Sequence, residues 1–255
     1  MLPVLRNAMW PRCRSRFVGL VALLILAPAA RAGPPYVTDD PETTDHRHYE
    51  AYLFASATST RAGTSSVAGL DFSYGAGPDL QLTLVAPIAH ERPNQGPSAT
   101  GLGNVELAAK FRLAHQARLG WDVSVFPRLF LPSASRRVGD QDEAYLLPVW
   151  IERDWGRWST FGGGGYAVNR GSDSRDYTLL AWAITRQVLP GLQIGAELFH
   201  RSADTRDGLP STGLSAGLRC DLSEHYHLLG SIGPGIQNAS VTNEHSWYLA
   251  LLITR

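Results

Sequence analysis

Residues 101–113 read GLGNVELAAKFRL, a stretch in which apolar and polar side chains alternate. The apolar alternate positions are Val105, Leu107, Ala109, Phe111 and Leu113. The intervening, mostly polar positions are Asn104, Glu106, Ala108, Lys110 and Arg112. Successive side chains of a β-strand point to opposite faces, so this period of two predicts a strand with one apolar and one ionic face. A helix of the same sequence would spread its charges around most of its circumference.

The rest of the chain repeats this two-faced pattern. Leu80, Leu82 and Leu84 alternate with Gln81 and Thr83, and similar alternation occurs within residues 119–129, 192–201 and 214–221. We expect about twelve strands, near residues 48–58, 65–75, 80–89, 102–114, 119–131, 143–154, 157–168, 175–188, 192–202, 210–222, 226–237 and 244–254. Along 157–168, 175–188 and 244–254 both faces are mixed, so the sequence leaves the orientation of these side chains open.

The links between the expected strands alternate strictly in length. Five are short turns, at residues 75–79, 115–118, 154–157, 189–191 and 222–225. The others are generally longer and more polar, at residues 59–64, 90–101, 132–142, 169–174, 203–209 and 238–243. Short turns at one rim and longer loops at the other are typical of outer-membrane barrels.

Alternation alone does not decide which face meets water, because a soluble barrel places its apolar face inside and a membrane barrel places it against lipid. Twelve strands of bilayer-spanning length exceed a soluble ligand-binding barrel of about eight strands. Aromatic residues also collect near the expected strand ends, as interfacial girdles require: Tyr49, Tyr74, Phe111, Trp121, Trp155, Trp158 and Tyr226 toward one rim, and Tyr145, Tyr177 and Trp247 toward the other. The sequence therefore predicts an all-β fold, a closed antiparallel transmembrane β-barrel with lipid outside.

Residues 1–32 are typical of a secretory signal peptide, with four arginines before an apolar run at 17–27 and small residues before the expected cleavage near Ala32. The apolar run is too short to span a bilayer, although a retained N-terminal anchor is the alternative. We expect residues 33–47 to form a polar, proline-rich irregular segment and residues 48–255 to form a single barrel domain.

The charge balance argues against nucleic acid as a partner. Residues 1–32 hold five of the 23 basic residues and no acidic residue, so the remaining chain carries 18 basic and 23 acidic residues, a net charge of −5. Only Cys220 remains after residue 32, so neither an internal disulfide nor a cysteine-based zinc site is expected. His46 and His48 alternate as metal ligands can, but only unplaced carboxylates lie nearby, and we predict neither a metal nor a cofactor.

With the apolar face against lipid, the polar face turns into the lumen. Enclosed charges must pair or stay hydrated, so we expect a charge network that either lines a pore or fills it. The candidate lumen-lining residues are Glu50, Asp71, Glu106, Lys110, Arg112, Asp122, Arg128, Glu152, Glu197, Arg201, Arg219 and Asp221.

Five of these residues lie on adjoining strands and are expected to meet on one lumenal wall: Glu106, Lys110, Arg112, Asp122 and Arg128. Lys110 is the only lysine of the chain. We expect Leu107→Arg, on the lipid face, to cost about 2–4 kcal/mol and Glu106→Gln, in the lumen, to be absorbed by water or neighbouring groups.

Two stretches resemble a known family. PPYVTDD at residues 34–40 and GLGNVELAAKFRL at 101–113 are similar to the two recurring motifs of the "meta-pathway of phenol degradation" family of Gram-negative outer-membrane transporters. The layout resembles the family along most of the chain after residue 32, although the family usually has Gly-Asp where this chain has Gly103-Asn104. The resemblance implies an outer-membrane barrel that passes aromatic or other hydrophobic small molecules. Outer-membrane lipid and the barrel-assembly machinery are the other expected partners.

Three classes of function fit the sequence. A channel or transporter for small molecules would use the lumen as its path, whereas a closed structural barrel would have no transport role. A lipid-acting outer-membrane enzyme would need a serine hydrogen-bonded to a histidine that a third polar group holds, and the eight histidines lie mostly in the lead-in, in loops or at strand ends. We therefore expect a non-enzymatic barrel. The four glycines at 162–165 lack the Lys-Ser/Thr of a phosphate loop and indicate a bent or closely packed strand.

Overall fold

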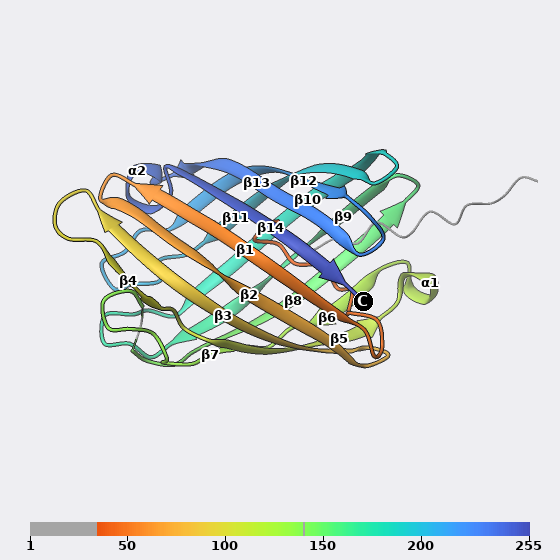
Figure 1. Ribbon diagram of the computed structural model, residues 1–255, viewed down its shortest axis with the longest axis horizontal. Helices are drawn as coiled ribbons and strands as arrows, with labels where there is room; N and C mark the ends of the chain where they lie inside the picture. The colour runs from red at the N-terminus through yellow and green to blue at the C-terminus, as the bar shows by residue number, and fades with distance from the viewer. Residues whose placement is uncertain (1–34, 140) are drawn as a thin grey trace, which may run out of the picture.

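The computed structural model describes residues 35–139 and 141–255, and the strands within them form one closed antiparallel β-sheet (Figure 1). The sheet contains β1 (Tyr49–Thr60), β2 (Gly63–Gly77), β3 (Leu80–Pro93), β4 (Ala99–Leu102), β5 (Glu106–Ala114), β6 (Asp122–Val125), β7 (Arg128–Phe130), β8 (Ala144–Trp155), β9 (Trp158–Asn169), β10 (Tyr177–Leu189), β11 (Leu192–Arg201), β12 (Ser211–Asp221), β13 (Tyr226–Gln237) and β14 (His245–Thr254). Two short helices, α1 (Gln116–Leu119) and α2 (Ala239–Thr242), lie in the links. Within the described residues, no helix has the length and apolarity to cross a membrane. The expected signal peptide, residues 1–32, lies outside the described residues.

Twelve strands cross the barrel wall. β4 and β5 both pair with β3, and β6 and β7 both pair with β5 and β8, so each of these two pairs is one interrupted strand and the fourteen segments make twelve crossings. Pro127 lies in the second interruption, where it has no N–H to donate to the ladder. β1 pairs with β14 in antiparallel register from Glu50↔Thr254 to Ser59↔His245, which closes the sheet. The predicted closed barrel of about twelve strands is confirmed.

The two rims differ, though not as regularly as predicted. The turns that follow β2, β8, β10 and β12 lie with the chain's C-terminus at one rim, which we call the short-turn rim (Figure 1). The opposite, long-loop rim carries α2 and the loops 94–98, 131–143, 170–176 and 202–210. Strict alternation is wrong at two links. Residues 61–62 form a tight turn at the long-loop rim, and α1 lengthens the link after β5 at the short-turn rim.

An apolar belt covers the outside of the barrel. Leu82, Leu107, Phe111 and Leu218, which the alternation predicts to face lipid, are 48%, 44%, 40% and 41% exposed. Their inward neighbours, such as Lys110, are buried. This arrangement is that of a membrane-spanning barrel, since a soluble barrel would bury the leucines and expose the charges. Of the predicted girdle residues Tyr177 is misassigned, because its ring packs on a cluster inside the barrel.

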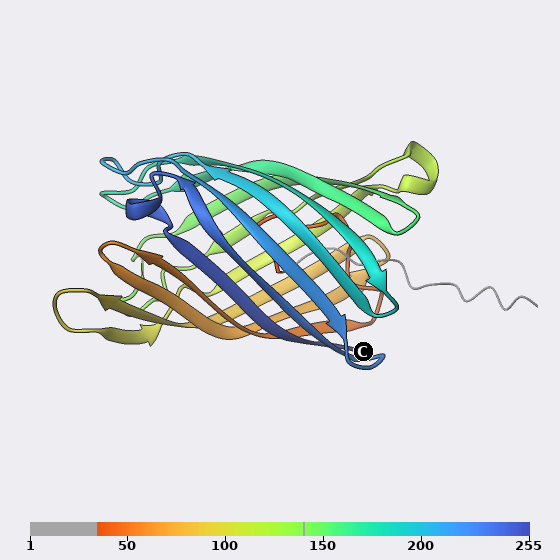
Figure 2. The ribbon, with the colours of Figure 1, turned by 90° about the horizontal axis from the view of Figure 1, so that it is seen from above.

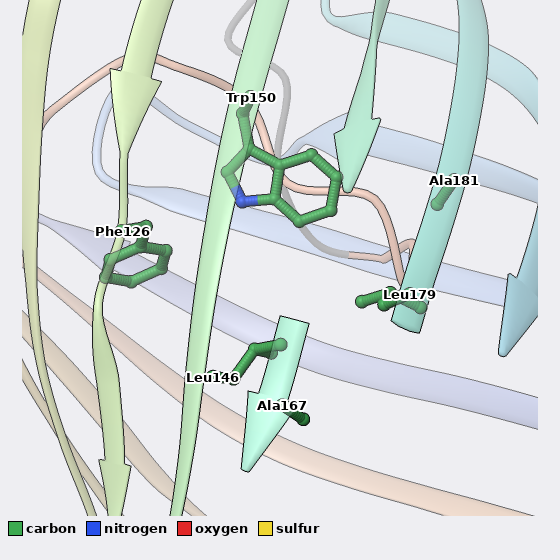
Figure 3. Packing of buried hydrophobic residues seen from close by; sticks show 6 residues of the cluster. All are labelled: Phe126, Leu146, Trp150, Ala167, Leu179 and Ala181. Carbon is green, nitrogen blue, oxygen red and sulfur yellow. The ribbon is translucent and has the colours of Figure 1, made fainter. Parts of the chain in front are cut away.

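Two of the three strands of open orientation, β9 and β10, are mixed because the lumen wall beside β8, β9 and β10 is itself apolar. The third, β14, also carries buried apolar side chains, Ala250 and Leu252. A buried hydrophobic cluster lines the inner face beside β8, β9 and β10 and comprises Phe126, Leu146, Trp150, Ala167, Leu179 and Ala181 (Figure 3). The four glycines of β9 accommodate aromatic neighbours on both faces. A Cβ on Gly163 would approach the inward Trp150 ring to 3.1 Å, and one on Gly162 would collide with the outward Trp182 ring. The glycines thus mark the closely packed strand that the sequence indicated.

Candidate functional site: the barrel lumen

The chain before β1 lies inside the barrel. We call residues 35–48 the plug segment; Figure 2 shows it in orange-red within the ring of strands. It is anchored at the short-turn rim, where the Arg47 N–H donates to the Gly75 carbonyl at 2.8 Å and the Gly75 N–H donates to the His48 carbonyl at 3.0 Å. Farther in, Thr38 and Asp40 are almost completely buried. The sequence predicted an irregular segment here but gave no position for it relative to the barrel.

Lys110 holds the plug segment from the β5 side. Its Nζ donates to Asp39 Oδ1 at 3.0 Å and to the Glu42 carbonyl at 3.1 Å, and it lies 3.6 Å from Asp40 Oδ1. The ammonium also lies 4.9 Å from the centroid of the Phe126 ring. Lys110 is 3% exposed, so a charge-assisted contact here is screened little by solvent. The two stretches that carry the family resemblance therefore touch each other in the lumen.

The opposite wall holds the same segment through Glu197 on β11. Glu197 Oε1 accepts from the Thr38 N–H at 2.5 Å and from Thr38 Oγ1 at 2.6 Å, while Oε2 accepts from Ser215 Oγ at 2.8 Å. On β13, Ser231 Oγ donates to the Pro35 carbonyl at 2.6 Å. The plug segment thus bridges β5 and β11 across the lumen.

Tyr36 packs tightly between these anchors. Its ring lies 6.1 Å, centroid to centroid, from the Phe161 ring on β9. Gly217 on β12 makes room for it, because a Cβ there would come within 2.7 Å of the tyrosine ring. Burial and the nearby carboxylate of Glu197 raise the pKa of Tyr36, so its hydroxyl remains neutral. Burial also raises the pKa of Asp40, and Lys110 opposes this rise by favouring the carboxylate.

Four of the five charges predicted to share one wall do meet there. Arg128 donates from Nε and Nη2 to the two oxygens of Glu106 at 2.6 and 2.7 Å, and Arg112 Nη2 donates to Asp122 Oδ1 at 2.6 Å. Lys110 instead turns to the plug segment. Glu106→Gln would therefore disturb a buried two-bond ion pair, and the expectation that water absorbs this exchange is replaced by an expected loss of stability.

Several of the remaining predicted lumen residues lie near the plug segment: Glu50, Asp71 and Arg219 line one small cavity with Lys110. Glu50 accepts from Tyr52 Oη at 3.0 Å, and Glu152 accepts from Ser159 Oγ at 2.6 Å. The volume of that cavity is about 60 Å³, and Asp39 also lines it. At the long-loop rim Arg201 pairs with Asp204 at 3.2 Å, and at the short-turn rim Arg219 pairs with Asp221 at 3.2 Å.

Two larger cavities end on the plug segment from opposite sides. The short-turn vestibule has a volume of about 1040 Å³, and Thr44, Asp45 and His48 of the plug segment form part of its lining. The long-loop vestibule has a volume of about 310 Å³, and its lining includes Pro35, Tyr36 and Val37. The plug segment therefore stands between the two mouths of the barrel.

Two functional features were not predicted from the sequence: the position of the plug segment in the lumen and the apolar part of the lumen wall. One signal for the plug segment was present, because Asp39 and Asp40 precede the strands and the only lysine of the chain is predicted to point into the lumen. The apolar cluster gave no such signal, since an apolar lumen face beside an apolar lipid face has no alternation to detect.

The outer face carries a hydroxyl beside a histidine, the arrangement that a lipid-acting enzyme would need. His200 Nδ1 lies 2.8 Å from Thr212 Oγ1, and Thr212 Oγ1 donates to Gln237 Oε1 at 2.6 Å. In this arrangement the threonine hydroxyl donates its proton to the amide of Gln237 rather than to the imidazole. Within residues 35–139 and 141–255 no group of three His, Cys, Asp or Glu side chains is arranged to hold a metal.

Comparison with solved structures identifies the kind of barrel. No protein-family model matches the sequence, and no curated protein matches it. An outer membrane channel from Pseudomonas putida F1 superposes with a TM-score of 0.71 at 14% identity, over 85% of this chain and 98% of that one. The chain has the fold of an outer-membrane β-barrel. A second such barrel, the KdgM porin solved in complex with disordered oligogalacturonate, gives a TM-score of 0.53 at 11% identity, over 81% and 96% of the two chains.

Proposed function

We propose that this outer-membrane barrel is a channel for small uncharged molecules with substantial apolar surface, and that the plug segment is its constriction. One observation carries the proposal: two vestibules of about 1040 and 310 Å³ reach the same short segment from opposite rims. A barrel that served only as a scaffold would need neither vestibule. By the usual orientation of such barrels, the long-loop rim faces the outside and the short-turn rim faces the periplasm.

The lining of the lumen supports the class of solute. Phe126, Leu146 and Trp150 form an apolar inner wall, and Phe130 and Phe199 pack against the same cluster. Small-molecule sites are mostly apolar, with a few polar groups that fix orientation. The charges of Lys110, Arg112 and Arg128 are engaged in the ion pairs described above, so they do not offer an open charged path. The family resemblance, with its hydrophobic solutes, points in the same direction.

Tyr36→Ala tests whether the plug segment limits passage. Removing this ring leaves the ion pairs of the segment intact but takes away its packing against Phe161. We therefore expect arabinose, a small uncharged solute that reports how wide the path is, to enter proteoliposomes faster through this variant than through the wild type. Tyr166→Ala, which removes an exposed tyrosine on the outer face of β9, is the matched control and should not change the rate. The measurement is osmotic swelling followed by light scattering. Swelling no faster than in protein-free liposomes for both the wild type and Tyr36→Ala would contradict the proposed function.

A further inference from the structure

We propose that the long-loop vestibule is a binding site for a neutral amphipathic solute, one that has an apolar face and donates a hydrogen bond from its other edge. The inference rests on the proposed function and makes its solute class more specific. At about 310 Å³ the vestibule is near the lower end of the range of about 300–1,000 Å³ typical of small-molecule pockets. A single small ring with a short substituent is the size of ligand that such a space accepts.

One side of the vestibule is apolar. Leu179 on β10 and Phe199 on β11 line it, and the Tyr36 ring contributes at the plug-segment end. Leu179 belongs to the buried lumen cluster and Phe199 packs against it, so this side continues into the apolar wall around Trp150. An aromatic or aliphatic ring placed here would exchange water for carbon contacts, which is the main source of affinity for such ligands.

The other side carries hydroxyl groups from neighbouring strands. Ser56 and Thr58 come from β1, Ser211 from β12, Ser231 from β13 and Ser246 from β14. β12, β13, β14 and β1 are consecutive in the sheet, so these groups form one continuous polar wall. The vestibule therefore offers an apolar side and a hydrogen-bonding side to the same ligand.

Asn243 provides the specific polar contact. It follows α2, is 5% exposed and lines the vestibule. Its Nδ2 donates to Ser246 Oγ at 3.3 Å, but within residues 35–139 and 141–255 no group donates to its Oδ1. A buried acceptor without a donor costs free energy. A ligand whose hydroxyl or amide N–H donates to Asn243 Oδ1 would therefore form a hydrogen bond that the described residues do not make.

The charged residues of the vestibule are already paired, which argues for a neutral ligand. Glu197 accepts three hydrogen bonds, from Thr38 and Ser215. Arg201 pairs with Asp204 at 3.2 Å, and its guanidinium lies 5.7 Å from the centroid of the Tyr177 ring. An ionic ligand would have to break one of these arrangements to find a counter-charge.

Calorimetric titration of the full barrel in lipid nanodiscs, with empty nanodiscs as the blank, tests the site. The probes are benzyl alcohol and ethylbenzene, which differ by a hydroxyl in place of a methyl group. We expect Asn243→Ala to weaken benzyl alcohol binding about three- to tenfold, the value of one hydrogen bond, and to leave ethylbenzene unchanged. Phe199→Leu should instead weaken the binding of both probes. Asn169→Ala, which changes an asparagine at the same rim that does not line the vestibule, should affect neither.

A second measurement needs no variant that could fail to fold. In ¹⁵N-labelled wild-type barrel, benzyl alcohol should shift the side-chain amide resonance of Asn243, and ethylbenzene should leave it in place. Two results would overturn the site: an equal loss of affinity for both probes in Asn243→Ala, or an Asn243 resonance that benzyl alcohol does not shift. Because neither measurement requires solute to cross the membrane, a barrel that binds as expected but fails the arabinose test would refute the channel and retain the binding site.

Discussion

Lys110→Met is expected to release the plug segment and raise the single-channel conductance of a barrel that still folds. The substitution keeps an unbranched side chain but leaves Asp39 and Asp40 without their buried cation. Removing one partner of a buried ion pair costs about 3–5 kcal/mol, which shifts the docking of the segment by about a hundredfold or more. The loss falls mainly on the segment, because the ion pairs of Lys110 with Asp39 and Asp40 both join β5 to the plug segment. Planar-bilayer recording gives the conductance.

Arg112→Met is the matched control for this experiment. Arg112 is two residues away on the same face of β5, but its hydrogen-bonded ion pair is with Asp122 in the barrel wall, whereas Lys110 is hydrogen-bonded to the plug segment itself. It should destabilise the barrel without opening it. The same rise in conductance in both variants would show that the effect comes from general weakening. An unchanged conductance in folded Lys110→Met would show that Lys110 does not hold the plug segment in the lumen.

Leu107→Arg is expected to destabilise the barrel by about 2–4 kcal/mol, whereas Leu209→Arg should cost almost nothing. The two leucines are similarly exposed, at 44% and 46%, but Leu107 lies on the outer face of β5 and Leu209 lies in the loop 202–210. The difference between them therefore isolates the cost of placing a guanidinium in lipid. Urea unfolding from phospholipid vesicles, followed by tryptophan fluorescence, gives both free energies.

Equal free energies of unfolding for the two arginine variants would contradict the assignment of the outer face to lipid. Glu106→Gln belongs in the same series. Because Glu106 accepts two hydrogen bonds from Arg128, the loss of unfolding free energy in Glu106→Gln should be comparable to that in Leu107→Arg rather than much smaller.

The barrel was predictable from the sequence because alternate residues face lipid, which favours apolar side chains, and the lumen, which favours polar ones. Where lipid covers Leu82 and Leu107 and the polar lumen holds Gln81 and Glu106, the alternation gives the strand, its two faces and the neighbouring turns. The number of strands and most of their limits follow from this pattern. The pattern disappears in β9 and β10, since the lumen there holds Phe161 and Leu179, and both faces of these strands are apolar.

The position of the plug segment was not predictable for a different reason. The hydrogen bond between Thr38 and Glu197 joins residues 159 positions apart, and the contact between Asp39 and Lys110 spans 71 positions. Neither contact leaves a periodic trace in the sequence, because an irregular segment has no repeating face. Only the closure of the barrel brings these residues together.

The single-channel conductance of a barrel without its plug tests the central claim most directly. In this variant residues 36–44 are replaced by a glycine-serine linker of equal length, and residues 45–48, which pair with Gly75, are kept. The variant's heat-dependent shift on a gel shows whether the barrel is folded. We predict a conductance several times that of the wild type, equal to or above that of Lys110→Met. A folded linker variant with the wild-type conductance would show that the plug segment is not the constriction.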